Sequence, residues 1–143
     1  MNTLWLCRFL MLCFVCVAAG CDQRPEIELF NHSGRDLVVS IVLPSGIEEF
    51  SLKRAQSVRF LLVKTFSIAS GNQKFMYAVD LSNGVALRNL ERGEFFNRRI
   101  LKHQIEPNGH IIVLPPESTA AVENLPPQPK GYPILPSAPW IGG

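Results

Sequence analysis

Residues 37–52, with the sequence LVVSIVLPSGIEEFSL, decide the class of fold. The first seven of them, 37–43, are nearly continuous apolar residues, which predicts a central strand buried on both faces. Pro44, Ser45 and Gly46 end this run with turn residues, and 47–52 form a second strand-like segment. Two short strands separated by a tight turn are typical of an all-β domain.

The same spacing continues on both sides of this stretch. Between residues 26 and 114, strand-like segments alternate with turn signals at steps of roughly ten residues, as in sandwiches and barrels. Lys64 interrupts the apolar row of the longest segment, 57–70, so we expect a bulge or bend there. The sequence therefore predicts a small antiparallel β-sandwich of about seven or eight strands. The apolar row of residues 57–70 consists of Val58, Phe60, Leu62, Phe66 and Ile68.

Residues 99–114 are the clearest hairpin. Pro107 and Gly109 fit a type I turn followed by a left-handed residue, which gives a three-residue loop with a bulge. This register places Glu106 opposite His110 and puts alternate residues on one face, which we expect to belong to the core. Those residues are Leu101, His103, Ile105, Ile111 and Val113.

Two segments lack a strand pattern. Residues 85–99 are ambiguous, and we expect a strand and loop there with one short helical turn. Residues 115–143 hold eight prolines between Pro115 and Pro139, and such a segment favours polyproline II or coil. We expect an extended C-terminal tail, and we expect its deletion to leave the melting temperature nearly unchanged.

The charges and cysteines exclude several classes of protein. Of the 143 residues, 14 are Lys or Arg and 12 are Asp or Glu, so the charge gives no drive toward nucleic acid. All four cysteines lie within the first 21 residues, which excludes a disulfide framework or a thiolate metal site in the domain. We expect no cofactor and no metal.

The N-terminus has the pattern of an export signal. Residues 9–19 form an unbroken apolar run of eleven residues, which is too short to span a bilayer and suits a signal peptide. Small residues follow, ending in Ala19 and Gly20, and then comes Cys21. Asp22 begins a polar stretch at once.

This junction resembles the bacterial lipobox, in which small residues precede a lipid-modified cysteine. The resemblance implies cleavage after Ala19 and Gly20 and acylation of Cys21, which would anchor the chain to a membrane on its periplasmic side. Ala18 stands where the lipobox usually has Leu. The resulting division is a signal peptide at 1–20, a lipidated linker at 21–25, a sandwich at 26–114 and a tail at 115–143. The choice between inner and outer membrane stays open.

Candidate catalytic groups carry little signal. His32 and Ser33 lie in one turn with Asp36 nearby, but a hydrolytic triad needs a base held within reach of both its partners. His103 and His110 flank the hairpin turn on opposite faces, which argues against a shared metal. We therefore predict that the protein is not an enzyme.

Two surfaces are candidate interaction sites. A basic cluster with two aromatic residues would suit anionic lipid headgroups or an acidic partner. A solvated face is the simpler explanation of the basic residues, and the aromatic pair would equally suit a core edge. Tyr132, Ile134 and Trp140 in the tail would either recognise a partner or fill grooves on their own domain. The cluster comprises Arg88, Arg92, Phe95, Phe96, Arg98, Arg99 and Lys102.

These features favour a membrane-anchored envelope lipoprotein that acts as a non-enzymatic adaptor with an envelope protein as its partner. Several bacterial secretion-system lipoproteins are similar in size and architecture, although no motif of theirs aligns. The alternatives are a ligand-binding module for a lipid or a cell-wall fragment, and a small hydrolase. A cleft with convergent polar groups would favour the ligand-binding module.

Overall fold

The computed structural model describes residues 25–79 and 100–140, and all regular elements of this part are strands. Short strands with tight turns follow the alternation of the sequence. In chain order they are β1 (Glu26–Asn31), β2 (Leu37–Leu43), β3 (Gly46–Leu52), β4 (Ser57–Leu61), β5 (Thr65–Ser70), β6 (Gln73–Ala78), β7 (Ile100–Ile105) and β8 (Ile111–Val113).

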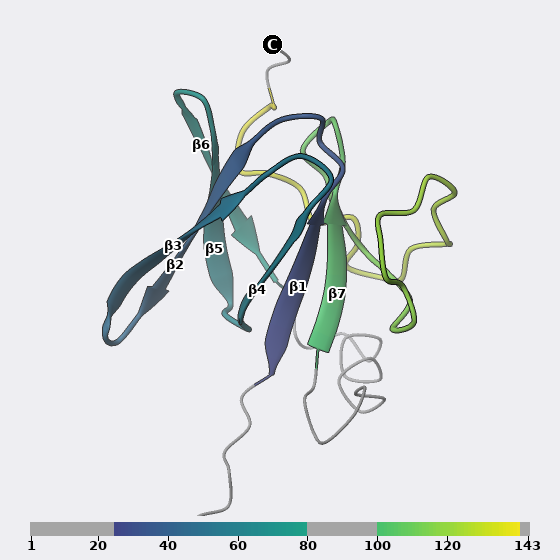
Figure 1. The fold of residues 1–143 in the computed structure, drawn as a ribbon, viewed down its shortest axis with the longest axis horizontal. Coiled ribbons are helices and arrows are strands. Elements are labelled where there is room, and N and C mark those ends of the chain that lie inside the picture. Colours follow the sequence, from purple (N-terminus) through teal and green to yellow (C-terminus); the bar gives the residue numbers. More distant parts are fainter. Residues whose placement is uncertain (1–24, 80–99, 141–143) are drawn as a thin grey trace, which may run out of the picture.

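The strands form two four-stranded sheets, which confirms the small β-sandwich (Figure 1). The first sheet has the order β4-β1-β7-β8, and the second has the order β3-β2-β5-β6. Every pair is antiparallel except β1 and β7, which run parallel with Glu26 beside Ile100. Between β1 and β7 the chain visits the second sheet twice, so this parallel pairing has no local signal in the sequence.

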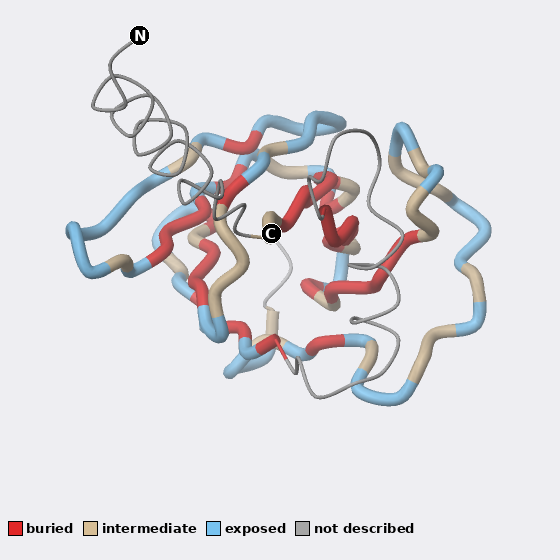
Figure 2. The backbone as a smooth tube through the Cα atoms, turned by 90° about the horizontal axis from the view of Figure 1, so that it is seen from below, coloured by how far each residue is buried: buried red, intermediate tan, exposed pale blue. Residues whose placement is uncertain are grey.

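The core lies between the sheets and takes its side chains from alternate positions of both. Ile27, Leu29 and Ile105 of the first sheet pack with Val39 and Ile68 of the second, and each of these residues is at most 1% exposed. Figure 2 shows the buried segments gathered in the middle of the molecule and the exposed turns around them.

The predicted break at Lys64 is confirmed. β4 ends at Leu61 in the first sheet and β5 begins at Thr65 in the second, so residues 62–64 carry the chain from one sheet to the other. Phe60 and Phe66, on either side of the break, are both buried in the core, while Lys64 is exposed. The bend therefore keeps the apolar row inside and the ammonium group in water.

The prediction that residues 37–43 are buried on both faces is wrong. β2 is an inner strand of its sheet, but Val38 is 38% exposed and Val42 is 74% exposed. Only the face that carries Val39 and Ile41 packs against the first sheet. A two-layer sandwich buries one face of each sheet, so the second face stays in solvent unless another segment covers it.

The hairpin of residues 99–114 forms as predicted. The amide of Glu106 donates to the carbonyl of His110 at 2.9 Å, and Gly109 takes a left-handed φ of 78°. His103 pairs with Val113 and Ile105 with Ile111, and all four are buried. The opposite face of β7 is also buried, which the sequence did not indicate.

The tail packs on the domain and covers part of the outer face of the first sheet, over the end of β1, β7 and β8. Ala121 and Val122 pack against Phe30, Ile112 and Leu114, and these three are buried. Two glutamine side chains join the tail to the sheet, one from β7 and one from the tail itself. Gln104 accepts a hydrogen bond from the Val122 amide at 2.7 Å, and Gln128 accepts one from the Val113 amide at 2.9 Å. Because the tail is packed on the domain, its deletion should lower the melting temperature, whereas the sequence suggested almost no change.

Further along, the tail closes one open side of the sandwich. Ile134 exchanges two backbone hydrogen bonds with Ile111 at the edge of the first sheet, at 2.8 and 2.9 Å. Ser137 bonds to the backbone of Met76 at the edge of the second sheet. β8 and β6 are the edge strands of their sheets, so the tail pairs with edges that would otherwise invite aggregation.

The sandwich has two distinct ends, visible in Figure 1. The Pro25 end contains Pro25, the β2–β3 turn at 44–45 and the connection 62–64. The Gly109 end contains the loops 32–36 and 53–56 and the hairpin turn 106–109.

Candidate binding groove

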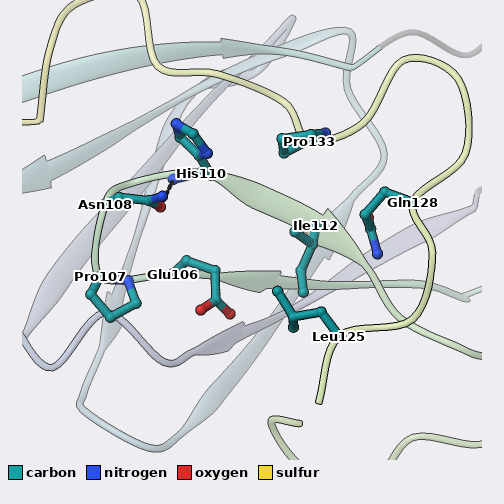
Figure 3. A pocket seen from close by; sticks show the side chains of 8 residues that line it. All are labelled: Glu106, Pro107, Asn108, His110, Ile112, Leu125, Gln128 and Pro133. Atoms are coloured by element: carbon teal, nitrogen blue, oxygen red, sulfur yellow. Dashed lines mark hydrogen bonds between the residues drawn. The ribbon is translucent and has the colours of Figure 1, made fainter. Parts of the chain in front are cut away.

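A groove of about 410 Å³ opens at the Gly109 end between the β7–β8 hairpin and the tail (Figure 3). The hairpin supplies one wall and the tail the other. The lining residues are Glu106, Pro107, Asn108, His110, Ile112, Leu125, Gln128 and Pro133. Its volume lies within the usual range of ligand sites, roughly 300–1,000 Å³.

Turn chemistry fixes the hairpin wall. The side chain of Asn108 accepts a hydrogen bond from the His110 amide at 3.0 Å, and the Gly109 amide donates to the Glu106 carbonyl at 2.9 Å. Tyr77 reaches the same turn from the second sheet and donates its hydroxyl hydrogen to the Gly109 carbonyl at 2.9 Å. Because this hydroxyl is buried, the pKa of Tyr77 is raised, so it remains a donor.

The tail wall is held by Gln128. Its amide group accepts from the Val113 amide at 2.9 Å and donates to the Val113 carbonyl at 3.2 Å, which imitates a neighbouring strand. Leu125, three residues earlier, is 45% exposed and faces the groove beside Ile112. The apolar part of the groove therefore rests on a tail that is fixed to β8.

Glu106 supplies the acidic group of the groove. Its carboxylate accepts a hydrogen bond from Gln104, which is fully buried, and lies 3.4 Å from Nδ1 of His32. The side chain of Glu106 is 16% exposed and that of His32 is 38% exposed. Gln104 also donates to the Val122 carbonyl at 2.8 Å, so one network connects the hairpin, the loop 32–36 and the tail.

The lining contains one carboxylate and neither Lys nor Arg. Ile112 and Leu125 offer apolar contact, while Glu106 and Gln128 offer polar groups to a ligand. An occupant that combines an apolar side chain with a cationic or hydrogen-bond-donating group would complement this lining.

The residues of the candidate triad have separate partners. The Ser33 hydroxyl donates to Asn31 at 2.6 Å, and His32 faces Glu106. Asp36 accepts hydrogen bonds from the Arg54 amide and from Lys53, and these contacts lower its pKa. His32, Ser33 and Asp36 therefore do not form the hydrogen-bonded relay that such chemistry requires.

His103 is a buried partner of the tail. It is 1% exposed, and its Nε2 lies 2.6 Å from the Tyr132 hydroxyl while its Nδ1 lies 3.3 Å from the Leu101 carbonyl. Burial lowers the pKa of His103 to about 4, so the ring is neutral at neutral pH. His110 lies on the other face, in the groove. Within residues 25–79 and 100–140, no three His, Cys, Asp or Glu side chains gather as metal ligands.

The candidate basic patch lies almost entirely outside the described residues. Lys102 is its one described member, and its assignment to an exposed patch is wrong, because it is only 5% exposed. Its ammonium group donates to the Ser118 carbonyl at 2.6 Å, beneath the tail. Outside the described residues lie Ala19, Gly20, Cys21, Arg88, Arg92, Phe95, Phe96, Arg98 and Arg99.

The three tail residues singled out from the sequence all face their own domain. Tyr132 contacts His103, Ile134 is 7% exposed, and Trp140 stacks on Phe75 with ring centres 4.5 Å apart. The structure therefore favours the second of the two interpretations, in which they fill grooves on the sandwich.

The groove is not evident from the sequence. The turn pattern identifies Glu106 as part of the hairpin turn, and no motif singles out Gln104 or Gln128. The available signal was the pair Lys102 and Gln104, polar residues on the outer face of a strand whose neighbours are apolar. Their burial depends on a tail more than ten residues away, which periodicity alone does not place.

No protein-family model, curated protein or solved structure matches this chain. None of the described residues belongs to a helix with the length and apolar character needed to cross a membrane.

Proposed function

We propose that the protein is a lipid-anchored module of the bacterial cell envelope, a non-enzymatic adaptor that binds a segment of a partner protein in its groove. The attachment rests on the sequence, in which the apolar run 9–19 leads through Ala19 and Gly20 to Cys21. The observation that carries the adaptor role is the position of the groove at the end of the sandwich opposite the start of β1.

The short linker supports this orientation. β1 begins at Glu26, five residues after Cys21, and a stretch of that length spans at most about 18 Å. Acyl chains on Cys21 would keep the Pro25 end near the bilayer. The Gly109 end and its groove would then face the periplasm, where a partner has free access.

The lining supports a protein segment as the occupant. Ile112 and Leu125 would accept an apolar side chain, and the Glu106 carboxylate would accept a hydrogen bond from a Lys or Arg beside it. A groove of about 410 Å³ has room for a few side chains of an extended segment rather than for a folded domain.

The anchor is tested by replacing Cys21. A Cys21→Ser variant should lose metabolic labelling by a palmitate analogue and should move from the membrane fraction to the soluble fraction. Membrane association that persists in an unlabelled variant would contradict the anchor.

The groove is tested by photocrosslinking in intact cells. A photoreactive residue at Leu125, in the groove, should give a discrete crosslinked product that Glu106→Arg weakens. Leu135 is the matched control, because it is also an exposed tail leucine but does not line the groove. Equal products from both positions, or none from Leu125, would overturn the adaptor role.

The groove volume favours one alternative, an envelope ligand-binding module for a lipid or a cell-wall fragment. The same crosslinked product distinguishes the two. A protein partner gives a product whose added mass is lost to protease digestion and yields peptides of a second chain. A small ligand gives a mass increase that survives digestion on the peptide containing residue 125.

A further inference from the structure

The β2–β3 hairpin presents an apolar pair to solvent at its tip. Val42 is 74% exposed and Ile47 is 68% exposed, and the two face each other directly in the strand register. They flank the turn at Pro44 and Ser45, which is also exposed. Neither residue belongs to the core, so the tip displays apolar surface that the described residues leave uncovered.

The tip extends beyond the rest of its sheet. β5 pairs with β2 only at Val38, Val39 and Ser40, so the last part of β2 has β3 as its only neighbour among the described strands. A two-stranded projection of this kind gains little from exposing two aliphatic side chains to water. An apolar contact outside the sandwich would remove this surface from water.

The position of the tip identifies that contact. Ser40 pairs with Ser67 and Glu26 pairs with Leu61, so the β2–β3 turn and the start of β1 lie at the same Pro25 end (Figure 1). The linker from Cys21 to Glu26 spans at most about 18 Å. The lipid anchor of the proposed function would hold this end of the sandwich at a bilayer.

We propose that the tip formed by Val42, Pro44, Ser45 and Ile47 inserts into the bilayer interface beside the acylated Cys21. This inference rests on the proposed lipid anchor. The two aliphatic side chains add a second, weak point of attachment, and two points fix the orientation that one flexible tether leaves free. The groove at the other end is then held facing away from the membrane.

The charges near the tip indicate a neutral lipid surface. Glu48 and Glu49 follow Ile47 and are exposed, and Lys64 is an exposed cation at the same end. Two carboxylates beside the apolar pair would be repelled by anionic headgroups, so phosphatidylcholine vesicles are the appropriate probe.

The absence of other cysteines in the mature chain permits a clean test. After Cys21, whose thiol the lipid occupies, the sequence has no cysteine, so one added thiol can carry an environment-sensitive fluorophore. Ser45→Cys places the fluorophore at the tip without altering Val42 or Ile47. Asn72→Cys is the matched control, an exposed turn residue at the Gly109 end.

The acylated mature protein, which begins at Cys21, is reconstituted in phosphatidylcholine vesicles that contain a fraction of spin-labelled lipid. The fluorophore at position 45 should shift to shorter wavelength and be quenched several-fold more strongly than the one at position 72. Adding Val42→Ser and Ile47→Ser to the Ser45→Cys protein should remove most of that quenching, while the protein stays bound through its anchor.

Two outcomes would overturn the inference. One is equal quenching at positions 45 and 72, and the other is quenching at 45 that the serine substitutions leave unchanged. Intact mass measurement of the same sample separates these results from failure of the proposed function, because a chain without acyl groups refutes the anchor itself. Circular dichroism of the serine variant confirms that the sheet is retained.

Discussion

β2 and β7 are inner strands of opposite sheets, and their environments reverse what their sequences suggest. β2 reads LVVSIVL and leaves Val38 and Val42 exposed on its outer face. β7 reads ILKHQI, with three polar residues among six, and is buried along its whole length. The more hydrophobic strand is the less buried one.

The difference lies in what covers each outer face. Tail residues 118–122 lie over β7, where Lys102 donates to the Ser118 carbonyl and Gln104 bonds to the backbone of Val122. The described part of the chain places no such segment over Val42. Buried polar side chains are tolerated when each has a partner, and the tail backbone supplies partners for Lys102 and Gln104. Burial is therefore decided by a remote segment.

Deleting residues 115–143 should have the largest effect, because it would expose the outer face of β7 to solvent, as the outer face of β2 already is. The deletion removes the buried Ile134 and exposes Phe30, Ile112 and Leu114. We expect the free energy of unfolding to fall by roughly 4 kcal/mol or more, and the melting temperature to fall by about 15 °C. Thermal unfolding followed by circular dichroism measures this, and an unchanged melting temperature would refute the packed tail.

Acid should lower the free energy of unfolding of the protein through His103 in β7. The unfolded pKa is near 6.5 and the folded pKa is about 4, so the unfolded state binds more protons between these values. Stability should therefore fall as the pH drops from 6.5 to 4, by roughly 3 kcal/mol in all. Denaturant unfolding at several pH values measures the slope.

A His103→Gln variant is the control for this slope. It should be less stable at neutral pH, because it leaves the Tyr132 hydroxyl without its ring partner. Its stability should vary less than that of the parent between pH 6.5 and 4. An equal slope in both proteins would assign the acid effect to other groups.

Two glycines isolate the contribution of the tail at a single position. Gly34 and Gly109 have the same φ of 78°, but a Cβ at Gly34 meets open space and one at Gly109 overlaps the Trp140 ring. Gly34→Ala should cost roughly 1 kcal/mol from backbone strain alone. Gly109→Ala should cost at least about twice as much, because Trp140 must also move. Equal costs, measured by denaturant unfolding, would mean that Trp140 leaves its position easily.

The smallest effect is expected on the bare face of β2. Val42→Thr should change the free energy of unfolding by less than about 0.5 kcal/mol, because the side chain is mostly in water. Val39→Thr, on the core face of the same strand, should cost roughly 2 kcal/mol by burying an unpaired hydroxyl. Similar costs at both positions would show that another segment covers the outer face.

Much of the fold follows from local patterns. The turn at 106–109, the break at Lys64 and the alternation of core residues depend on neighbours within a few positions. The groove does not follow from local patterns. Glu106 and His32 are 74 positions apart in the chain, and Gln104 and Val122 are 18 positions apart. No spacing rule for side chains covers such distances, so the site appears only once the strands and the tail are in place.

The sequence by itself determined the strands, the tight turns and a cysteine-free domain, because these depend on backbone preference and residue type. Tertiary structure alone decided the parallel pairing of β1 with β7, the covering of one sheet and the groove beside Glu106. Those features arise where segments distant in the chain compete for the same surface, and the segment that best satisfies the exposed polar groups and apolar side chains occupies it.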